Sequence, residues 1–141
     1  TGKLQLFKSA DPQYKDGEFG RDFVYVKDAV EMTLHFMEPL ATASGSDNTG
    51  GLFNVGSGRM NTWNSLADAI FAALDRPRNV EFIEMPEHLR DRYQYHTQAD
   101  LTRLRTAGYT PATTELDAAV ADYIQNYLLP DKYLGDLSGE S

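Results

Sequence analysis

The sequence predicts an α/β chain of about three short strands and four helices. Short runs of β-branched and aromatic residues are typical of strands. Longer segments repeat apolar residues every three or four positions, as amphipathic helices do. The chain has 141 residues, of which 41% are hydrophobic, so it is long enough to bury a core.

The overall charge and composition exclude several classes of function. A formal net charge of −8 argues against a broad nucleic-acid interface, which needs a basic face. No apolar run is long enough to span a bilayer, so we expect no membrane partner and a cytoplasmic location. The chain has no cysteine, and no second ligand stands at metal spacing around His35, so we expect no metal site.

The first third of the chain predicts two extended segments and one helix. Residues 4–7 suggest a short edge strand, residues 9–20 a loop, and residues 23–26 a buried strand. Asp28 and Glu31 form the D-x-x-E pattern of a helix N-terminus, and Pro39 should end that helix near Glu38. Its wide apolar face should include Val30, Leu34 and Met37, with Ala29, Thr33 and Phe36 on the adjoining line. His35 should be packed or partly exposed beside that face.

The middle of the chain predicts a surface loop, a strand and a tight turn. Residues 41–51 are small and polar, and residues 52–59 read as a buried strand that runs into Gly56-Ser57-Gly58. A G-x-G turn without the third glycine is weak evidence for a phosphate site. We therefore favour a purely conformational role for these glycines.

The remaining elements are a helix, a strand and two further helices. Thr62 should cap a helix that ends at residues 75–77, and residues 80–85 alternate as a strand closed by Pro86. Capping boxes at Thr97 with Asp100 and at Thr114 with Asp117 predict the last two helices, the first ended by Gly108 and the second spanning residues 116–127. Residues 130–141 should be a frayed tail.

Two polar regions are candidates for ligand binding. Arg21 stands at the lip of the first predicted buried strand, where a guanidinium could bind a phosphate or carboxylate through two hydrogen bonds, or could pair with Asp22 or another surface acid. Residues 88–100 gather two arginines, two tyrosines and two glutamines. This composition suits the wall of a sugar-phosphate pocket, and it also suits an exposed connection.

Three motifs carry a resemblance to a known family. Arg21-Asp22-Phe23-Val24-Tyr25-Val26-x-Asp28 resembles the block found in extended short-chain dehydrogenase/reductases that act on nucleotide sugars. Leu6-Phe7-Lys8-Ser9, and Arg92-Tyr93-Gln94 followed by Thr97-Gln98-Ala99-Asp100, resemble the heptose-epimerase branch of that family.

The resemblance implies a site and a reaction. Arg21 would contact the diphosphate of the sugar nucleotide, and the other substrate contacts would be Phe7, Lys8, Ser9, Ala10 and Tyr93. Enzymes of this branch use NADP to interconvert ADP-D-glycero- and ADP-L-glycero-D-manno-heptose at C6 in lipopolysaccharide core biosynthesis, and they are homo-oligomers.

The family's catalytic and cofactor motifs are missing from this sequence. None of the eight tyrosines has a lysine four positions later, and no glycine-rich dinucleotide fingerprint is present. The chain also begins with Thr1 rather than Met. We therefore expect residues 1–141 to be the C-terminal substrate-binding portion of an epimerase, without its Rossmann cofactor domain and inactive alone. The alternatives are another nucleotide-sugar epimerase or dehydratase, and a stand-alone non-catalytic nucleotide-sugar-binding module.

Overall fold

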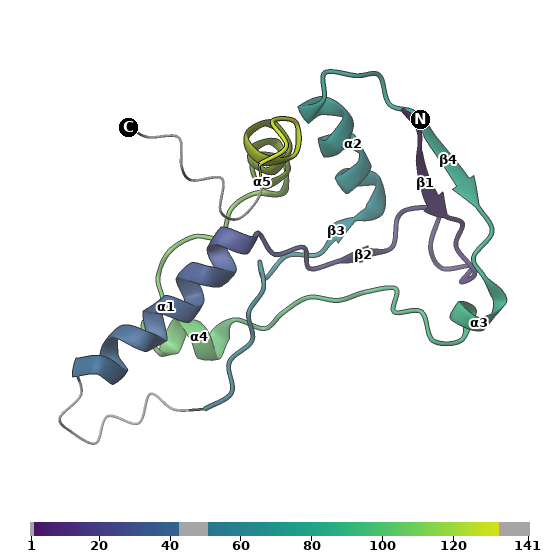
Figure 1. The fold of residues 1–141 in the computed structure, drawn as a ribbon. Coiled ribbons are helices and arrows are strands. Elements are labelled where there is room, and N and C mark those ends of the chain that lie inside the picture. Colours follow the sequence, from purple (N-terminus) through teal and green to yellow (C-terminus); the bar gives the residue numbers. More distant parts are fainter. Residues whose placement is uncertain (1, 43–50, 133–141) are drawn as a thin grey trace. The chain divides into compact units, whose positions relative to one another are not determined.

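The computed structural model describes residues 2–42 and 51–132, and it divides into two compact units. The first unit consists of Thr1–Phe19, Thr62–Tyr93 and Glu115–Ser141, and the second of Gly20–Asn61 and Gln94–Thr114. The described residues form four short strands, five α-helices and one π-helix (Figure 1). This mixed composition confirms the predicted α/β class. No helix in the described part is long and apolar enough to cross a membrane.

The first unit contains a parallel pair of strands. β1 (Leu4–Phe7) pairs with β4 (Val80–Ile83), with Leu4 opposite Val80 and Phe7 opposite Ile83. The pairing continues past the strands, because the Lys8 N–H donates to the Ile83 carbonyl at 2.8 Å. Both strands were predicted, although β4 ends at Ile83 rather than at Met85. The one-turn helix α3 (Glu87–Arg90) follows β4.

Helices form the rest of the first unit. α2 (Trp63–Ala73) packs against α5 (Leu116–Tyr123), which continues into the π-helix η1 (Ile124–Leu128). Ala67, Phe71 and Ile124 are buried there. The predicted cap of α2 is confirmed, since Thr62 Oγ1 accepts a hydrogen bond from the Ser65 N–H at 3.0 Å.

The second unit is built on α1 (Val26–Thr42) and α4 (Thr102–Thr106). Its core cluster joins residues from α1, α4 and the segment after α4: Met32, Leu104 and Tyr109, with Phe36 and Leu101 packed against them. Gly108 has φ +98°, a left-handed conformation that suits glycine, and it follows the end of α4 as predicted. β2 (Gly20–Arg21) forms a short two-stranded sheet with β3 (Asn61–Thr62).

Two predicted buried strands are absent from the described residues. Residues 22–25 are irregular, α1 begins at Val26, and residues 52–55 are also irregular. Val26 is 60% exposed and Leu52 is 84% exposed. These predictions were wrong because an apolar run becomes a buried strand only where a neighbouring strand pairs with it, and neither run has such a partner among the described residues.

The predicted start, end and apolar face of the first helix also need correction. Asp28 is the third residue of α1 rather than its cap, and α1 continues past Pro39 to Thr42. Phe36 of the predicted face does pack against the core, together with Met32, while Val30, Leu34 and Met37 are exposed. His35 makes edge contacts with the rings of Phe36 and Tyr109, as expected of a packed histidine.

Both later capping boxes were predicted wrongly. α4 begins at Thr102 and α5 at Leu116, and neither N-cap residue makes a side-chain cap bond, although Asp100 Oδ1 accepts from the Thr102 N–H at 2.9 Å. Thr97 and Thr114 are instead bonded to Asp22 and Asp28, as described below. Of the predicted loop at 41–51, residues 43–50 lie outside the described residues, as does most of the predicted tail at 130–141.

Candidate functional site

Five of the six predicted substrate contacts lie in the first unit. Phe7 ends β1, and its ring meets the ring of Tyr93 edge to face, with centroids 6.5 Å apart. Tyr93 also meets the buried ring of Phe19 at 5.2 Å in the same geometry. Such edge contacts favour one ring orientation. The structure therefore places Phe7 and Tyr93 side by side, although the two residues are far apart in the sequence.

The residues after Phe7 line a small polar groove. It has a volume of about 340 Å³. Its lining consists of three residues that follow β1 and four that follow β4: Lys8, Ser9, Ala10, Glu84, Met85, Arg90 and Asp91. Lys8 Nζ lies 2.7 Å from Glu84 Oε1. The hydrogen bond and charge of Glu84 raise the pKa of Lys8 above its ordinary value, and the same contact lowers the pKa of Glu84. Lys8 is thus a cation already held by one carboxylate.

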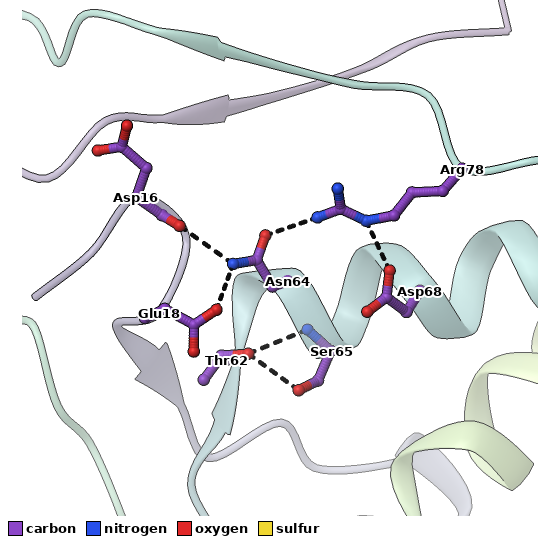
Figure 2. A network of polar contacts seen from close by, with 7 residues as sticks. All are labelled: Asp16, Glu18, Thr62, Asn64, Ser65, Asp68 and Arg78. Carbon is purple, nitrogen blue, oxygen red and sulfur yellow. Dashed lines mark hydrogen bonds and ion pairs between the residues drawn. The ribbon is translucent and has the colours of Figure 1, made fainter.

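The loop that follows the groove is fastened to α2 by Asn64. Its amide Nδ2 donates to the Asp16 carbonyl at 3.0 Å and to Glu18 Oε1 at 2.5 Å (Figure 2). Its Oδ1 accepts from Arg78 Nη2 at 2.8 Å. Arg78 is held in turn by Asp68 at 2.6 Å. Since Asp16 Oδ1 also accepts from the Ser9 N–H, this network reaches the predicted substrate segment.

Arg21, the sixth predicted contact, lies in β2 of the second unit. Its Nη1 donates to the Gly20 carbonyl at 3.1 Å, and its side chain is partly buried. The Gly20 N–H donates to the Tyr95 carbonyl at 3.0 Å. A Cβ on Gly20 would lie 2.1 Å from the Asn61 carbonyl oxygen, so only glycine lets the chain pass here next to Arg21.

Asp22 is the most extensively bonded carboxylate of the second unit that the structure describes. Oδ1 accepts from the Ser57 N–H and the Ser57 hydroxyl, both at 2.6 Å. Oδ2 accepts from the Gly58 N–H at 2.9 Å and from the Ala99 N–H at 2.8 Å. The carboxylate therefore ties together the Arg21-Asp22 block, the Gly56-Ser57-Gly58 turn and the Thr97–Asp100 motif.

These hydrogen bonds favour the charged form of Asp22. Burial raises the pKa of Asp22, but the hydrogen bonds from Ser57, Ala99 and Gly58 outweigh it, and the net pKa lies below the ordinary value. The sequence interpretation treated Asp22 only as a possible ion-pair partner of Arg21. Its role depends on two segments more than 30 positions away, and no local pattern announces it.

A broader cleft of about 920 Å³ lies in the second unit, and it is lined in part by residues of the predicted pocket wall, namely His96, Gln98, Ala99 and Asp100. Arg59 and Arg105 line it, but both guanidinium groups donate to backbone carbonyls, Arg59 to Thr113 and Thr114 and Arg105 to Tyr109. Gly58, with φ +74°, forms part of its wall, in line with the conformational role predicted for the glycine turn. Among the described residues no cluster of three His, Asp or Glu side chains could hold a metal ion.

Comparison with known proteins identifies the relatives of this chain. No family model matches it. It is 42% identical over 127 residues to ADP-L-glycero-D-manno-heptose-6-epimerase of Nitratidesulfovibrio vulgaris strain DP4, covering 90% of this chain and 37% of the relative. The relative of the same name from Fusobacterium nucleatum is 42% identical, with 95% of this chain and 40% of the relative covered. The chain resembles the ADP-heptose 6-epimerases. It spans well under half of their length.

Solved structures agree with this family at the level of the fold. UDP-N-acetylglucosamine 4-epimerase from Methanobrevibacter ruminantium M1 has a TM-score of 0.67 at 19% identity, with 92% of this chain and 36% of that chain covered. The Bordetella bronchiseptica enzyme WbmH, solved in complex with NAD+, has a TM-score of 0.60 at 22% identity, with 89% and 36% covered. The chain therefore shares its fold with about a third of each of these two proteins.

Replacing Asn64 tests whether the α2 network orders the loop that carries Ser9 and Ala10. Asn64→Ala removes the bonds to Asp16 and Glu18, so we expect the Ser9 and Glu18 amides to exchange with solvent on the order of tenfold faster, since a hydrogen bond contributes about 1 kcal/mol. Hydrogen exchange measured by NMR gives the rates. Asn126→Ala is the matched control, because Asn126 bonds only to Asp122 on its own helix among its described contacts. Equal rates in the two variants would contradict the role of Asn64.

The lowered pKa of Asp22 predicts an acid-dependent contribution to stability. As the pH falls, the unfolded state binds a proton at this group before the folded state does, so the contribution is present above the ordinary Asp range and is lost as the pH falls through the folded-state pKa. Asp22→Asn should lower the free energy of unfolding at neutral pH by about 2 kcal/mol. The difference from the wild type, measured by urea denaturation at several pH values, should shrink toward acid pH. A difference that stays constant with pH would show that the Asp22 charge contributes nothing.

Proposed function

We propose that this chain is the substrate-binding portion of an NADP-dependent epimerase. The reaction of the whole enzyme would interconvert ADP-D-glycero- and ADP-L-glycero-D-manno-heptose at C6, in lipopolysaccharide core biosynthesis. The observation that supports this proposal most strongly is the 42% identity, over 90% of the chain, to a relative named for that epimerisation.

Each substrate contact is assigned a role that its chemistry suits. Arg21 would bind the diphosphate, since a guanidinium can present two parallel N–H donors to one phosphate. Phe7 and Tyr93 would offer ring surface and a hydroxyl to the nucleotide sugar, and Lys8, Ser9 and Ala10 would line the polar part of the pocket. The edge contact between Phe7 and Tyr93 supports their assignment to one site.

The cofactor and the proton-transferring groups would come from the part of the enzyme that this sequence does not contain. When bound, the nicotinamide cofactor would supply reversible hydride transfer at the sugar C6. This chain alone should therefore bind substrate without turning it over. WbmH in complex with NAD+ supports the use of a nicotinamide cofactor. We further propose that the whole enzyme is a cytoplasmic homo-oligomer without a metal requirement, as the resemblance implies.

Nucleotide binding by the chain tests this function. We expect it to bind ADP more tightly than UDP or GDP, as measured by isothermal titration calorimetry. Arg21→Ala should weaken ADP binding by about 10-fold to 100-fold, because a charge-assisted hydrogen bond contributes roughly 1.5 to 3 kcal/mol. Arg76→Ala removes the same charge from an exposed position in the first unit and should leave binding unchanged.

Two results would change the proposal. Tighter binding of UDP or GDP than of ADP would favour another nucleotide-sugar epimerase, such as the 4-epimerases that share the fold. ADP binding that is equal in the wild type and in Arg21→Ala would remove Arg21 from the site.

A further inference from the structure

We propose that Asp22 is the positioning residue that fixes Arg21 for binding a nucleoside diphosphate. The inference rests on the proposed function, in which Arg21 binds that group. It adds that the affinity for a diphosphate depends on a neighbouring carboxylate that does not itself contact the ligand.

The backbone on both sides of Arg21 is held by hydrogen bonds. The Gly20 N–H donates to the Tyr95 carbonyl at 3.0 Å, and the Asp22 N–H donates to Thr97 Oγ1 at 3.2 Å. Both acceptors lie in the segment that follows Tyr93. Arg21 therefore sits between two fixed peptide groups, so its Cα position is set by that segment.

The Asp22 side chain adds the connections that this backbone pairing lacks. Its four hydrogen bonds, from Ser57, Gly58 and Ala99, correspond to the number of acceptor sites on one carboxylate. Asp22 thus acts as a tether to two other segments. Gly56 lies close to the Asp22 carboxylate and to Ala99. A Cβ at Gly56 would lie 2.5 Å from the Ala99 Cβ and 2.9 Å from Asp22 Oδ2, so a larger residue would disturb these contacts.

A positioned guanidinium binds an anion with less loss of conformational entropy than a mobile one. An asparagine at position 22 keeps the shape of the side chain but replaces one acceptor oxygen with an NH₂ donor, which would face the N–H groups that now bond to Asp22. The hydrogen bonds that this oxygen accepts in Asp22 would then be lost. Arg21 would keep its charge, but the segment that sets its backbone position would be held less firmly, because the Ala99 N–H bonds to the Asp22 carboxylate. Ligand binding would then include the entropy cost of ordering Arg21.

Asp28→Asn provides a matched control. Asp28 is a carboxylate of the same unit, 6% exposed, whose oxygens accept from the Thr114 N–H and hydroxyl, both at 2.7 Å. Its loss should destabilise the unit without loosening the Arg21 backbone. Ser57→Ala, which removes only one of the four donors, gives a milder second variant in case Asp22→Asn does not fold.

The experiment measures the affinities of ADP and AMP at a temperature where every variant is folded. Asp22→Asn should reduce the preference for ADP over AMP by about tenfold, Ser57→Ala by less, and Asp28→Asn not at all. In an Arg21→Ala background, Asp22→Asn should have no further effect on ADP binding, because its influence passes through Arg21. Equal losses in Asp22→Asn and Asp28→Asn, or additive losses in the double variant, would overturn the inference.

A ligand-free measurement separates this inference from the proposed function. The NMR order parameter of the Arg21 guanidinium should fall in Asp22→Asn and stay at the wild-type value in Asp28→Asn. If the wild type shows no preference for ADP, the proposed function fails, and the order parameters still decide whether Asp22 positions Arg21. An unchanged order parameter in Asp22→Asn would refute the positioning role by itself.

Discussion

The arrangement of the second unit depends on the hydrogen bonds accepted by the Asp22 carboxylate. Three segments that are remote in sequence meet there, and two of them, the Arg21-Asp22 block and residues 97–100, belong to motifs that resemble the nucleotide-sugar enzymes. An ionised carboxylate that accepts backbone N–H groups is stable when partly buried, since the hydrogen bonds offset the cost of removing it from water. The motifs therefore belong to one structural feature, with Arg21 beside it.

Local sequence patterns predicted the elements whose stabilising contacts are also local. Thr62 is recognisable as a cap from the sequence because the N–H that it binds lies only three residues later. Gly108 is recognisable as a helix end because the positive φ that follows α4 suits glycine itself. Thr97 and Thr114 carry similar capping patterns and do not cap helices. Their side chains bond instead to Asp22 and Asp28, which are distant in sequence. Tertiary hydrogen bonds prevailed over the local pattern in both cases.

In the candidate site, too, some residues are recognisable from local motifs and others only from tertiary contacts. The residue motifs identified Phe7 and Tyr93, and the structure brings their rings together. The roles of all six substrate residues come from the resemblance and stay proposals. Asp22 could not be identified in this way, because its function lies in contacts with Ser57, Gly58 and Ala99 rather than in its own neighbourhood. The prediction of two buried strands was wrong for a related reason, since the burial of an apolar run depends on a neighbouring strand that is distant in sequence.

We propose that this chain binds the nucleotide sugar while the remainder of a longer enzyme performs hydride and proton transfer. The measurement that tests it most directly is the intact mass of the polypeptide that contains this segment in its native cells. We expect a polypeptide at least twice as long as these 141 residues, with room for a cofactor-binding domain of roughly 150 residues. A native polypeptide of only this length would contradict it and leave a stand-alone binding module.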